Sequence, residues 1–262
     1  MKAPSIKGFG TALKTLTLIP WPFKEDEAFS ASLSWFPIVG LLLGLILYGI
    51  SLPWDILPLP RWPEMIALLM VVADAWITRG LHLDGLADWA DSMGSFRGKE
   101  KRLSIMKDSS LGVFGGLVLI VALLAKWIAF ERLFASGSTI WLLAIFVISR
   151  DMLVELMSTL PYARNGEGTA KPFVDQASKK QRIVSHILTL LLCAPFGPLA
   201  LILLGAAFLE TRVFRIRCRI QFGGITGDLL GTAAEMVEIS LLIVCAFLGR
   251  NILIYTGWGW LI

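Results

Sequence analysis

Long apolar runs recur along this chain, and shorter polar connections separate them. The clearest runs cover residues 33–50, 65–78, 113–130, 140–160, 183–209 and 236–248. Several approach the ~20 residues that a helix needs to cross a bilayer core of ~30 Å. Only helices and closed barrels satisfy the backbone in lipid, and these runs lack the alternation of barrel strands. The pattern predicts an all-α fold, a polytopic transmembrane helical bundle.

Composition and charge agree with a membrane protein and indicate its orientation. The chain is 56% hydrophobic and 17% charged, with a mean hydropathy of +0.71, far from the balance of a soluble domain. Basic residues gather at the N-terminus and in the connections near 79–112 and 161–184, whereas connections 51–64 and 131–139 carry one arginine each. By the positive-inside rule, the N-terminus and both long loops are cytoplasmic.

The run 183–209 is predicted to be a helical hairpin and not a single crossing. Pro195 and Pro198 interrupt it, because proline removes a helical hydrogen bond. Two helices there return the arginine-rich segment that follows to the cytoplasm and make about seven crossings. The chain is therefore predicted to be one integral membrane domain, 1–262, with cytoplasmic loops near 79–112, 161–184 and 210–230.

Both ends of the chain are predicted to lie at the membrane surface. Residues 9–23 suggest an N-terminal interfacial helix, which Pro20 and Pro22 end. The last stretch, 252–262, is too short to cross a bilayer unaided.

A nucleic-acid-binding function and a disulfide framework can both be set aside. The net charge of +4 does not indicate a nucleic-acid partner, because the basic residues flank helices and do not cover one soluble face. Cys193, Cys218 and Cys245 are far apart and form no CxxC pair, so they are predicted to be small packing residues.

An acidic motif lies between the second and third apolar runs. Asp84, Asp88 and Asp91 follow His82, and this spacing puts the three carboxylates on one face of a helix, about one turn apart. Like charges this close repel each other, and a divalent cation such as Mg²⁺ offsets the repulsion. A solvated acidic helix end is the simpler alternative, but the neighbouring membrane segments favour a functional site.

A second acidic segment precedes the last long run. Three glycines between residues 223 and 227 permit tight turns whose amide groups can bind an anion. Asp228 and Glu235 are seven residues apart, hence on one helical face, and Glu238 follows one turn later. A flexible loop and an exposed helix start would explain each part alone. Two such segments on the same predicted membrane face favour a shared site.

Between these motifs, a charged loop leads directly into the third apolar run. Asp108, Ser109 and Ser110 are residue types that cap helix N-termini. A helix N-terminus with Lys107 beside it would also bind phosphate. The two roles are compatible.

Four charged residues lie inside apolar runs, where charge is costly. Arg150 and Asp151 interrupt the fourth run, and we expect Arg150 to be functional. Asp74 and Lys126 lie within two others and are expected either to snorkel or to pair.

Together, these motifs predict a membrane enzyme that acts on a diphosphate-linked substrate. Carboxylates that bind Mg²⁺, which in turn binds phosphate oxygens, are a general solution to phosphoryl transfer. The acidic motif has some likeness to that of CDP-alcohol phosphotransferases, and a membrane phosphotransferase of that type, acting on a nucleotide-linked lipid, is an alternative function. Asp88 stands where their arginine is expected.

A closer resemblance covers nearly the whole chain in order. The segments His82–Asp88, 106–112 and 223–235 resemble motifs of cobalamin synthase, the adenosylcobinamide-GDP ribazoletransferase family, and so do TLIPWP at 17–22 and the stretch 161–168. One departure is Ser110, where the resemblance leads us to expect a basic residue. The resemblance implies a Mg²⁺-dependent enzyme of the prokaryotic cytoplasmic (inner) membrane that acts late in vitamin B12 assembly.

The resemblance also implies substrates. Adenosylcobinamide-GDP would be joined to α-ribazole or its 5′-phosphate, giving adenosylcobalamin or its 5′-phosphate and GMP. These small molecules and the lipid bilayer are the expected partners, with no nucleic acid. A homo-oligomer or an association with other corrinoid-pathway enzymes is left open.

Site residues follow from the motif positions. The resemblance implies Asp84, Asp88 and Asp91 as Mg²⁺ ligands, with Asp228 and Glu235 as a second acidic group that binds metal or activates the ribazole hydroxyl. His82 would be a proton acceptor or a phosphate donor, with a structural role as the alternative. Substrate binding is expected from Lys107, Asp108, Arg150, Arg164, Gly224, Thr226 and Gly227.

Two further alternatives come from other function classes. A transporter would use Arg150 and the carboxylates as an ion path, and it predicts broken helices near mid-membrane. A purely structural membrane component predicts that Asp84 and Asp228 tolerate alanine.

Overall fold

The computed structural model describes residues 6–22, 29–94, 98–108, 110–166 and 168–259. These residues form helices and short 3-10 turns, with one isolated parallel bridge between Tyr162 and Ile225. The helices are α1 (Ile6–Leu16), α2 (Ser30–Leu33), α3 (Phe36–Ile56), α4 (Pro63–Ile77), α5 (Leu81–Met93), α6 (Lys99–Ile105), α7 (Val113–Ala135), α8 (Leu142–Thr159), α9 (Lys171–Gln176), α10 (Lys179–Cys193), α11 (Pro198–Gln221), α12 (Gly227–Leu248) and α13 (Asn251–Ile254). The expected all-α fold is confirmed for the part of the chain that the structure describes.

Several helices are suited to a membrane. By length and composition, α3, α7 and α12 could each cross a bilayer, and α4 with α5 adds a fourth crossing if this bent pair is one span. This indicates a membrane protein of three to four candidate spans among the described residues. The expected count of about seven crossings stays a prediction.

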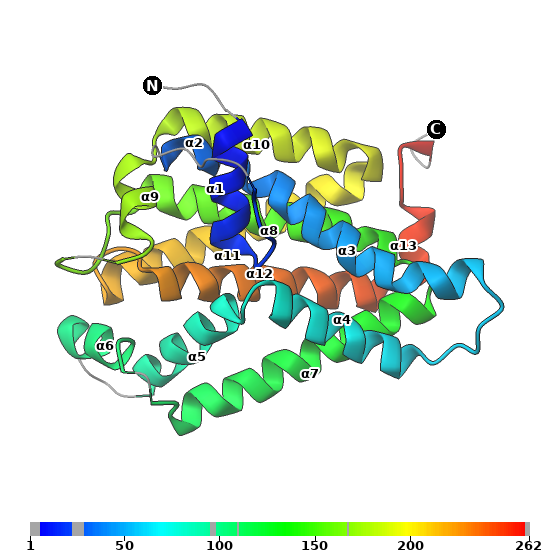
Figure 1. The fold of residues 1–262 in the computed structure, drawn as a ribbon, viewed down its shortest axis with the longest axis horizontal. Helices are drawn as coiled ribbons and strands as arrows, with labels where there is room; N and C mark the ends of the chain where they lie inside the picture. Colours follow the sequence, from blue (N-terminus) through cyan, green and yellow to red (C-terminus); the bar gives the residue numbers. More distant parts are fainter. Residues whose placement is uncertain (1–5, 23–28, 95–97, 109, 167, 260–262) are drawn as a thin grey trace.

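Helix α12 is at the centre of the bundle and α7 is on its outside. Of the apolar window in each helix, 72% is buried inside the protein for α12 and 28% for α7. Figure 1 shows α12 running through the middle, with α4, α5 and α7 on one side of it and α3, α8 and α10 on the other. Because α12 begins with Asp228 and continues through Glu235, its position decides what these two carboxylates meet.

The predicted hairpin is confirmed. The first part of the apolar run 183–209 lies in α10, which ends at Cys193. A 3-10 turn follows over Ala194–Phe196, and α11 begins at Pro198 and runs back (Figure 1). Gly197 joins them with a φ of 80°, a conformation that favours glycine. The cysteines are buried and form no disulfide in the described chain, as expected of packing residues.

Helix α1 (Ile6–Leu16) overlaps the first part of the predicted stretch 9–23, but it ends at Leu16, four residues before Pro20, so the prolines do not end it. Its Ala12, Leu13 and Leu16 are buried against the bundle. The amide of Leu18 donates to the carbonyl of Ile77 at 2.7 Å, which fixes the end of α1 to the end of α4. Its position at a membrane interface stays a prediction, as does that of the C-terminal stretch, whose residues 260–262 lie outside the described chain.

A sharp turn separates α4 from α5. The two helix axes are bent by 86°, and the turn consists of Arg79 with φ 59° and Gly80 with φ 62°. A left-handed conformation costs a non-glycine residue roughly 1–2 kcal/mol. The surrounding contacts hold this turn, because the Arg79 side chain donates to the carbonyl of Lys14 at 2.8 Å.

Candidate functional site

The two acidic motifs meet where α5 packs on the first turn of α12. A Cβ added to Gly85 would lie 2.4 Å from the carbonyl oxygen of Asp228, so only glycine permits this approach. The hydroxyl of Thr232 donates to the carbonyl of Gly85 at 2.9 Å and links the same two helices. The backbones of the first and second acidic segments are therefore in direct contact, as the sequence predicts.

The carboxylates at this contact form one acidic face. The charges of Asp84, Asp228 and Asp91 all act on Asp88, and the charge of Arg164 opposes them. Asp84 is exposed, while Asp88 and Asp228 are partly buried. Such a concentration of negative charge at one surface has a strong preference for a cation.

Asp91 also has a structural contact. Its two carboxylate oxygens accept hydrogen bonds from the amides of Gly112 at 2.7 Å and Gly115 at 2.8 Å. These amides belong to the N-terminus of α7, where unpaired N–H groups favour a carboxylate. Asp91 therefore fastens α5 to α7 while it adds charge to the acidic face.

The loop before α7 does not cap that helix. Helix α7 begins at Val113, with Gly112 as its N-cap and no side-chain cap from the loop itself. Asp108 instead accepts hydrogen bonds from the amide and hydroxyl of Ser110, and these hold the pKa of the Asp108 carboxyl below its usual value. The prediction that Asp108 or Ser110 caps α7 is wrong, because Asp91 supplies that acceptor from α5. Ser109 lies outside the described residues.

Arg164 connects the acidic face to a basic cleft. Its guanidinium pairs with Asp228 at 2.6 Å and donates to the carbonyl of Met106 at 3.1 Å. The cleft beside it has a volume of about 280 Å³ and is lined by cationic Lys99, Lys107 and Arg164. Lys107 and Arg164, both predicted phosphate ligands, are thus brought together next to Asp228.

The glycine-rich turn before α12 is positioned by the loop around Tyr162. Ala163 donates to the carbonyl of Ile225, and Ile225 donates to that of Pro161, both at 2.9 Å. A Cβ on Gly224 would lie 2.2 Å from the Pro161 carbonyl oxygen, which explains why glycine is needed there. This bridge sets the position of Arg164 relative to Asp228.

Thr226 and Gly227 begin α12. The Thr226 hydroxyl accepts a hydrogen bond from the amide of Leu229 at 3.3 Å and caps the helix. Gly227 lines a large cavity, together with His82 and Asp84 from α5. Of the predicted glycines, Gly227 therefore borders open space, whereas Gly224 is packed against backbone.

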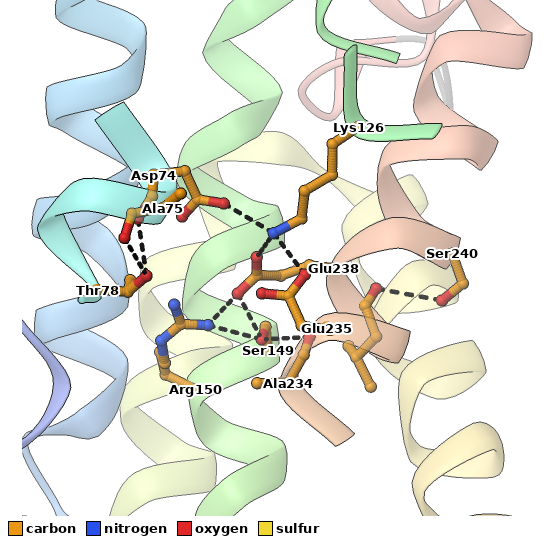
Figure 2. Close-up of polar contacts among 11 residues, drawn as sticks. Asp74, Ala75, Thr78, Lys126, Ser149, Arg150, Ala234, Glu235, Glu238 and Ser240 are labelled. Carbon is orange, nitrogen blue, oxygen red and sulfur yellow. Dashed lines mark hydrogen bonds and ion pairs between the residues drawn. The ribbon is translucent and has the colours of Figure 1, made fainter. Parts of the chain in front are cut away.

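A second group of charges is buried two turns further along α12. The ammonium of Lys126 lies 2.7 Å from Asp74, 2.7 Å from Glu235 and 3.0 Å from Glu238. Figure 2 shows Lys126 reaching between Asp74 on one side and the two glutamates on the other. All four side chains are at most 5% exposed. Of the two outcomes expected for Asp74 and Lys126, the structure shows pairing.

Arg150 belongs to this buried group. It is fully buried, pairs with Glu238, and donates to the hydroxyl of Ser149 at 2.9 Å. The structure therefore places Glu235 and Arg150 together in the interior, and it separates Glu235 from Asp228 although both lie on one helix. Asp228 and Glu235 are seven positions apart, about 10 Å along the axis. Glu235 pairs with Lys126 in the interior, whereas Asp228 pairs with Arg164 at the acidic face.

The two acidic groups differ in their suitability for a metal ion. Within the described ranges, Asp74, Glu235 and Glu238 are the three residues whose donor oxygens lie within 4.8 Å of one another. Lys126 already provides the cation there, so this group is satisfied without a metal. The oxygens of Asp84, Asp88 and Asp228 do not form such a group among the described residues, so a Mg²⁺ ion on the acidic face would need waters and substrate phosphates as its other ligands.

Sequence reasoning did not identify the walls of the cavity next to Asp84. The cavity has a volume of about 750 Å³, and most of its buried lining is apolar, for example Phe36, Leu153 and Phe173. These residues come from separate helices and have no motif spacing. A polar network of Asp151, Glu155 and His186 between α8 and α10 was also not predicted as a group.

Comparisons with known proteins agree with the geometry. A family profile described as cobalamin-5-phosphate synthase matches residues 8–246. Three similar proteins carry the name adenosylcobinamide-GDP ribazoletransferase. The protein of Chlorobium chlorochromatii (strain CaD3) is 41% identical over 252 residues, which cover 95% of this chain and 99% of the relative. That of Chlorobium phaeobacteroides (strain BS1) is 39% identical over 248 residues, covering 93% and 98%. That of Prosthecochloris aestuarii (strain DSM 271 / SK 413) is 39% identical over 237 residues, covering 89% and 94%. No solved structure matches.

Proposed function

This chain belongs to the cobalamin-5-phosphate synthase family, and on that premise we propose that it joins adenosylcobinamide-GDP to α-ribazole or α-ribazole 5′-phosphate with release of GMP. The products are adenosylcobalamin or its 5′-phosphate, late in vitamin B12 biosynthesis. The observation that carries this proposal is the direct contact of the two acidic segments at Gly85 and Asp228, beside a cationic cleft.

The reaction exchanges the phosphoanhydride bond of the diphosphate for a new phosphoester bond, and the ester to the cobinamide alcohol stays intact. A ribose hydroxyl of α-ribazole attacks the phosphorus that bears the cobinamide alcohol, and the bond from that phosphorus to the bridging oxygen of the diphosphate breaks. The hydroxyl proton has to be accepted, and the leaving GMP has to carry its negative charge. A carboxylate of the acidic face that does not bind the metal would accept this proton, and Asp84, which is exposed, is the candidate.

The acidic face would hold Mg²⁺ through Asp88 and Asp228. When bound, Mg²⁺ neutralises the charge of the diphosphate and stabilises the oxygen that departs. The chain's own contribution is to hold these carboxylates in place, through the helix contact at Gly85 and through Asp91, which fixes α5 on α7.

The cationic cleft would bind the phosphates of the nucleotide. Lys99, Lys107 and Arg164 face one another across a space of about 280 Å³. Arg164 already pairs with Asp228, so a diphosphate on this arginine would lie directly beside the acidic face. Cations in this position favour the departure of GMP because they stabilise its developing charge.

The site end of the bundle would face the cytoplasm from the cytoplasmic membrane. Helices α5, α6 and α9 and the start of α12 lie at the same end of the molecule in Figure 1. Lys99 begins α6, Lys107 follows it, and Lys171 begins α9, and basic residues favour the cytoplasmic side.

Magnesium removal provides the first test. Detergent-solubilised protein is mixed with adenosylcobinamide-GDP and α-ribazole, and GMP release is measured with Mg²⁺ in excess over both substrates and again with excess EDTA. We expect GMP release with Mg²⁺, loss of release with EDTA, and recovery when Mg²⁺ is restored. A folded, Mg²⁺-supplied sample that releases no GMP would overturn the proposal and direct attention to nucleotide-linked lipid substrates.

The helix contact at Gly85 gives a second, independent test. We expect Gly85→Ala to lower GMP release on the order of 100-fold, because a displacement of about 1 Å between α5 and α12 misaligns the carboxylates. Gly49→Ala in α3 is the matched control, since a Cβ there meets nothing within 4 Å. Equal activity of the two variants would show that the approach of α5 to α12 does not position the site.

A further inference from the structure

A large cavity of the described chain opens beside the acidic face. It has a volume of about 750 Å³ and is enclosed by α1, α3, α5, α8, α9 and the start of α12. This volume lies within the roughly 300–1,000 Å³ typical of sites for small organic ligands. The cationic cleft at Arg164 shares no lining residue with it.

The interior of the cavity suits a flat apolar ring. Phe36, Leu153, Met157 and Phe173 line it and are each at most 5% exposed. The rings of Phe29 and Phe173 pack edge to face with centroids 4.8 Å apart, and Phe36 follows at 6.4 Å from Phe173. Aromatic side chains in such a row favour an aromatic ligand over an aliphatic one.

One end of the cavity is polar and belongs to the reaction site. Asp84 lines the cavity and also acts electrostatically on Asp88 within the acidic face. His82, which is 3% exposed, lines the cavity as well, and its Nδ1 is buried without a hydrogen-bond partner in the described chain. A buried ring nitrogen without a partner is costly. The atom is closed off from the cavity in this structure, so a ligand hydroxyl reaches it only when the cavity wall moves.

We propose that this cavity binds the acceptor, with the benzimidazole ring of α-ribazole among Phe36, Met157 and Phe173 and its ribose directed at His82 and Asp84. The inference rests on the proposed function and identifies the part of the chain that selects the base. Two other substrate parts fit the cavity less well. A guanine base needs polar partners along its edge, which the buried wall of Phe36, Leu153 and Phe173 does not supply although threonines and Arg79 line other parts of the cavity. A corrin ring with its amide side chains is far larger than a nucleoside.

The arrangement also explains the placement of the two substrates. A base in the cavity and a diphosphate at Lys99, Lys107 and Arg164 approach the acidic face from different sides, since Asp84 borders the cavity and Asp228 pairs with Arg164. The acceptor and the diphosphate would then reach the acidic face from separate pockets, which leaves each substrate its own binding site.

The test compares the cavity with a second apolar groove. Ala170→Phe adds a ring inside the cavity, where Ala170 is 9% exposed, and Phe173→Leu removes one. Ala75→Phe is the matched control, because Ala75 lines a separate groove between α4 and α7. For each detergent-solubilised variant, thermal unfolding is recorded, the Kd for α-ribazole is measured by calorimetry without the corrinoid, and KM is measured for both substrates.

We expect Ala170→Phe and Phe173→Leu to raise the Kd and KM for α-ribazole about tenfold or more, with KM for adenosylcobinamide-GDP unchanged. The tenfold figure corresponds to the loss of one aromatic contact, about 1.4 kcal/mol. Ala75→Phe should leave both constants unchanged. Folded variants that turn over with an unchanged KM and Kd for α-ribazole would overturn the cavity assignment and leave the proposed function intact.

Failure of the proposed function gives a different pattern. If the wild type releases no GMP but binds α-ribazole, and Ala170→Phe weakens that binding, the cavity assignment is supported and the reaction is not. If the folded wild type shows no binding of α-ribazole by calorimetry, the cavity assignment is overturned whatever the activity.

Discussion

Asp228→Asn is expected to reduce GMP release by on the order of 10²–10³-fold or more, while the protein remains folded. The substitution keeps the size of the side chain but removes the charge that faces Asp88 and Arg164. Losing one group that stabilises transition-state charge costs about this much in other enzymes. The same loss is expected for Asp84→Asn, measured as initial GMP release at saturating substrates and Mg²⁺.

The control is a carboxylate of the same kind outside the site. Asp175 is exposed and pairs with Lys171 one helical turn away in α9, so Asp175→Asn should retain wild-type activity. Thermal unfolding of each variant separates loss of chemistry from loss of fold. If Asp228→Asn and Asp84→Asn both retain activity close to that of Asp175→Asn, the acidic face is not the reaction site, as a purely structural role for these residues predicts.

Lys126→Met is expected to destabilise the protein strongly. It removes the cation among Asp74, Glu235 and Glu238 and leaves buried carboxylates without their partner. Breaking a buried ion pair by removing one partner costs roughly 3–5 kcal/mol. For a chain of this size, that corresponds to a fall in the unfolding temperature of roughly 10 °C or more, which thermal unfolding in detergent would measure.

Two comparisons make this prediction specific. Lys180→Met removes an exposed lysine and should leave the unfolding temperature unchanged. The triple variant Lys126→Met, Asp74→Asn, Glu235→Gln removes the excess negative charge and leaves Glu238 paired with Arg150, so it should recover most of the lost stability. An unfolding temperature of Lys126→Met equal to that of Lys180→Met would contradict the structural role of the buried group.

The sequence predicts those parts of the protein whose cause is local. The apolar runs, the break at Pro195 and Pro198, and the acid spacing of α5 depend on neighbours along the chain, and the helices and the hairpin are found where they are expected. The approach of the two acidic segments was also predicted from their common membrane face. This approach requires a glycine at position 85, because Gly85 lies against the backbone of Asp228. That requirement becomes visible only in the packed structure.

Other features depend on contacts across the bundle and escape a sequence-based prediction. Glu235 shares a helical face with Asp228 by spacing, yet Lys126 from α7 and Asp74 from α4 meet it in the interior. Periodicity along one helix does not identify the helix that faces it. The same applies to the cavity, since Phe36 and Phe173 are far apart in the chain and become neighbours only in the fold.

The bend between α4 and α5 has a consequence for how deep the carboxylates lie. A straight continuation of α4 would spread Asp84, Asp88 and Asp91 over about 10 Å along its axis, at 1.5 Å per residue. Because of the 86° turn at Arg79 and Gly80, α5 runs nearly perpendicular to α4. The same three residues therefore lie at similar heights along the α4 axis. A large substrate that carries its diphosphate on a tether then needs to reach only one plane of the protein, and it can meet every carboxylate there without entering the bundle.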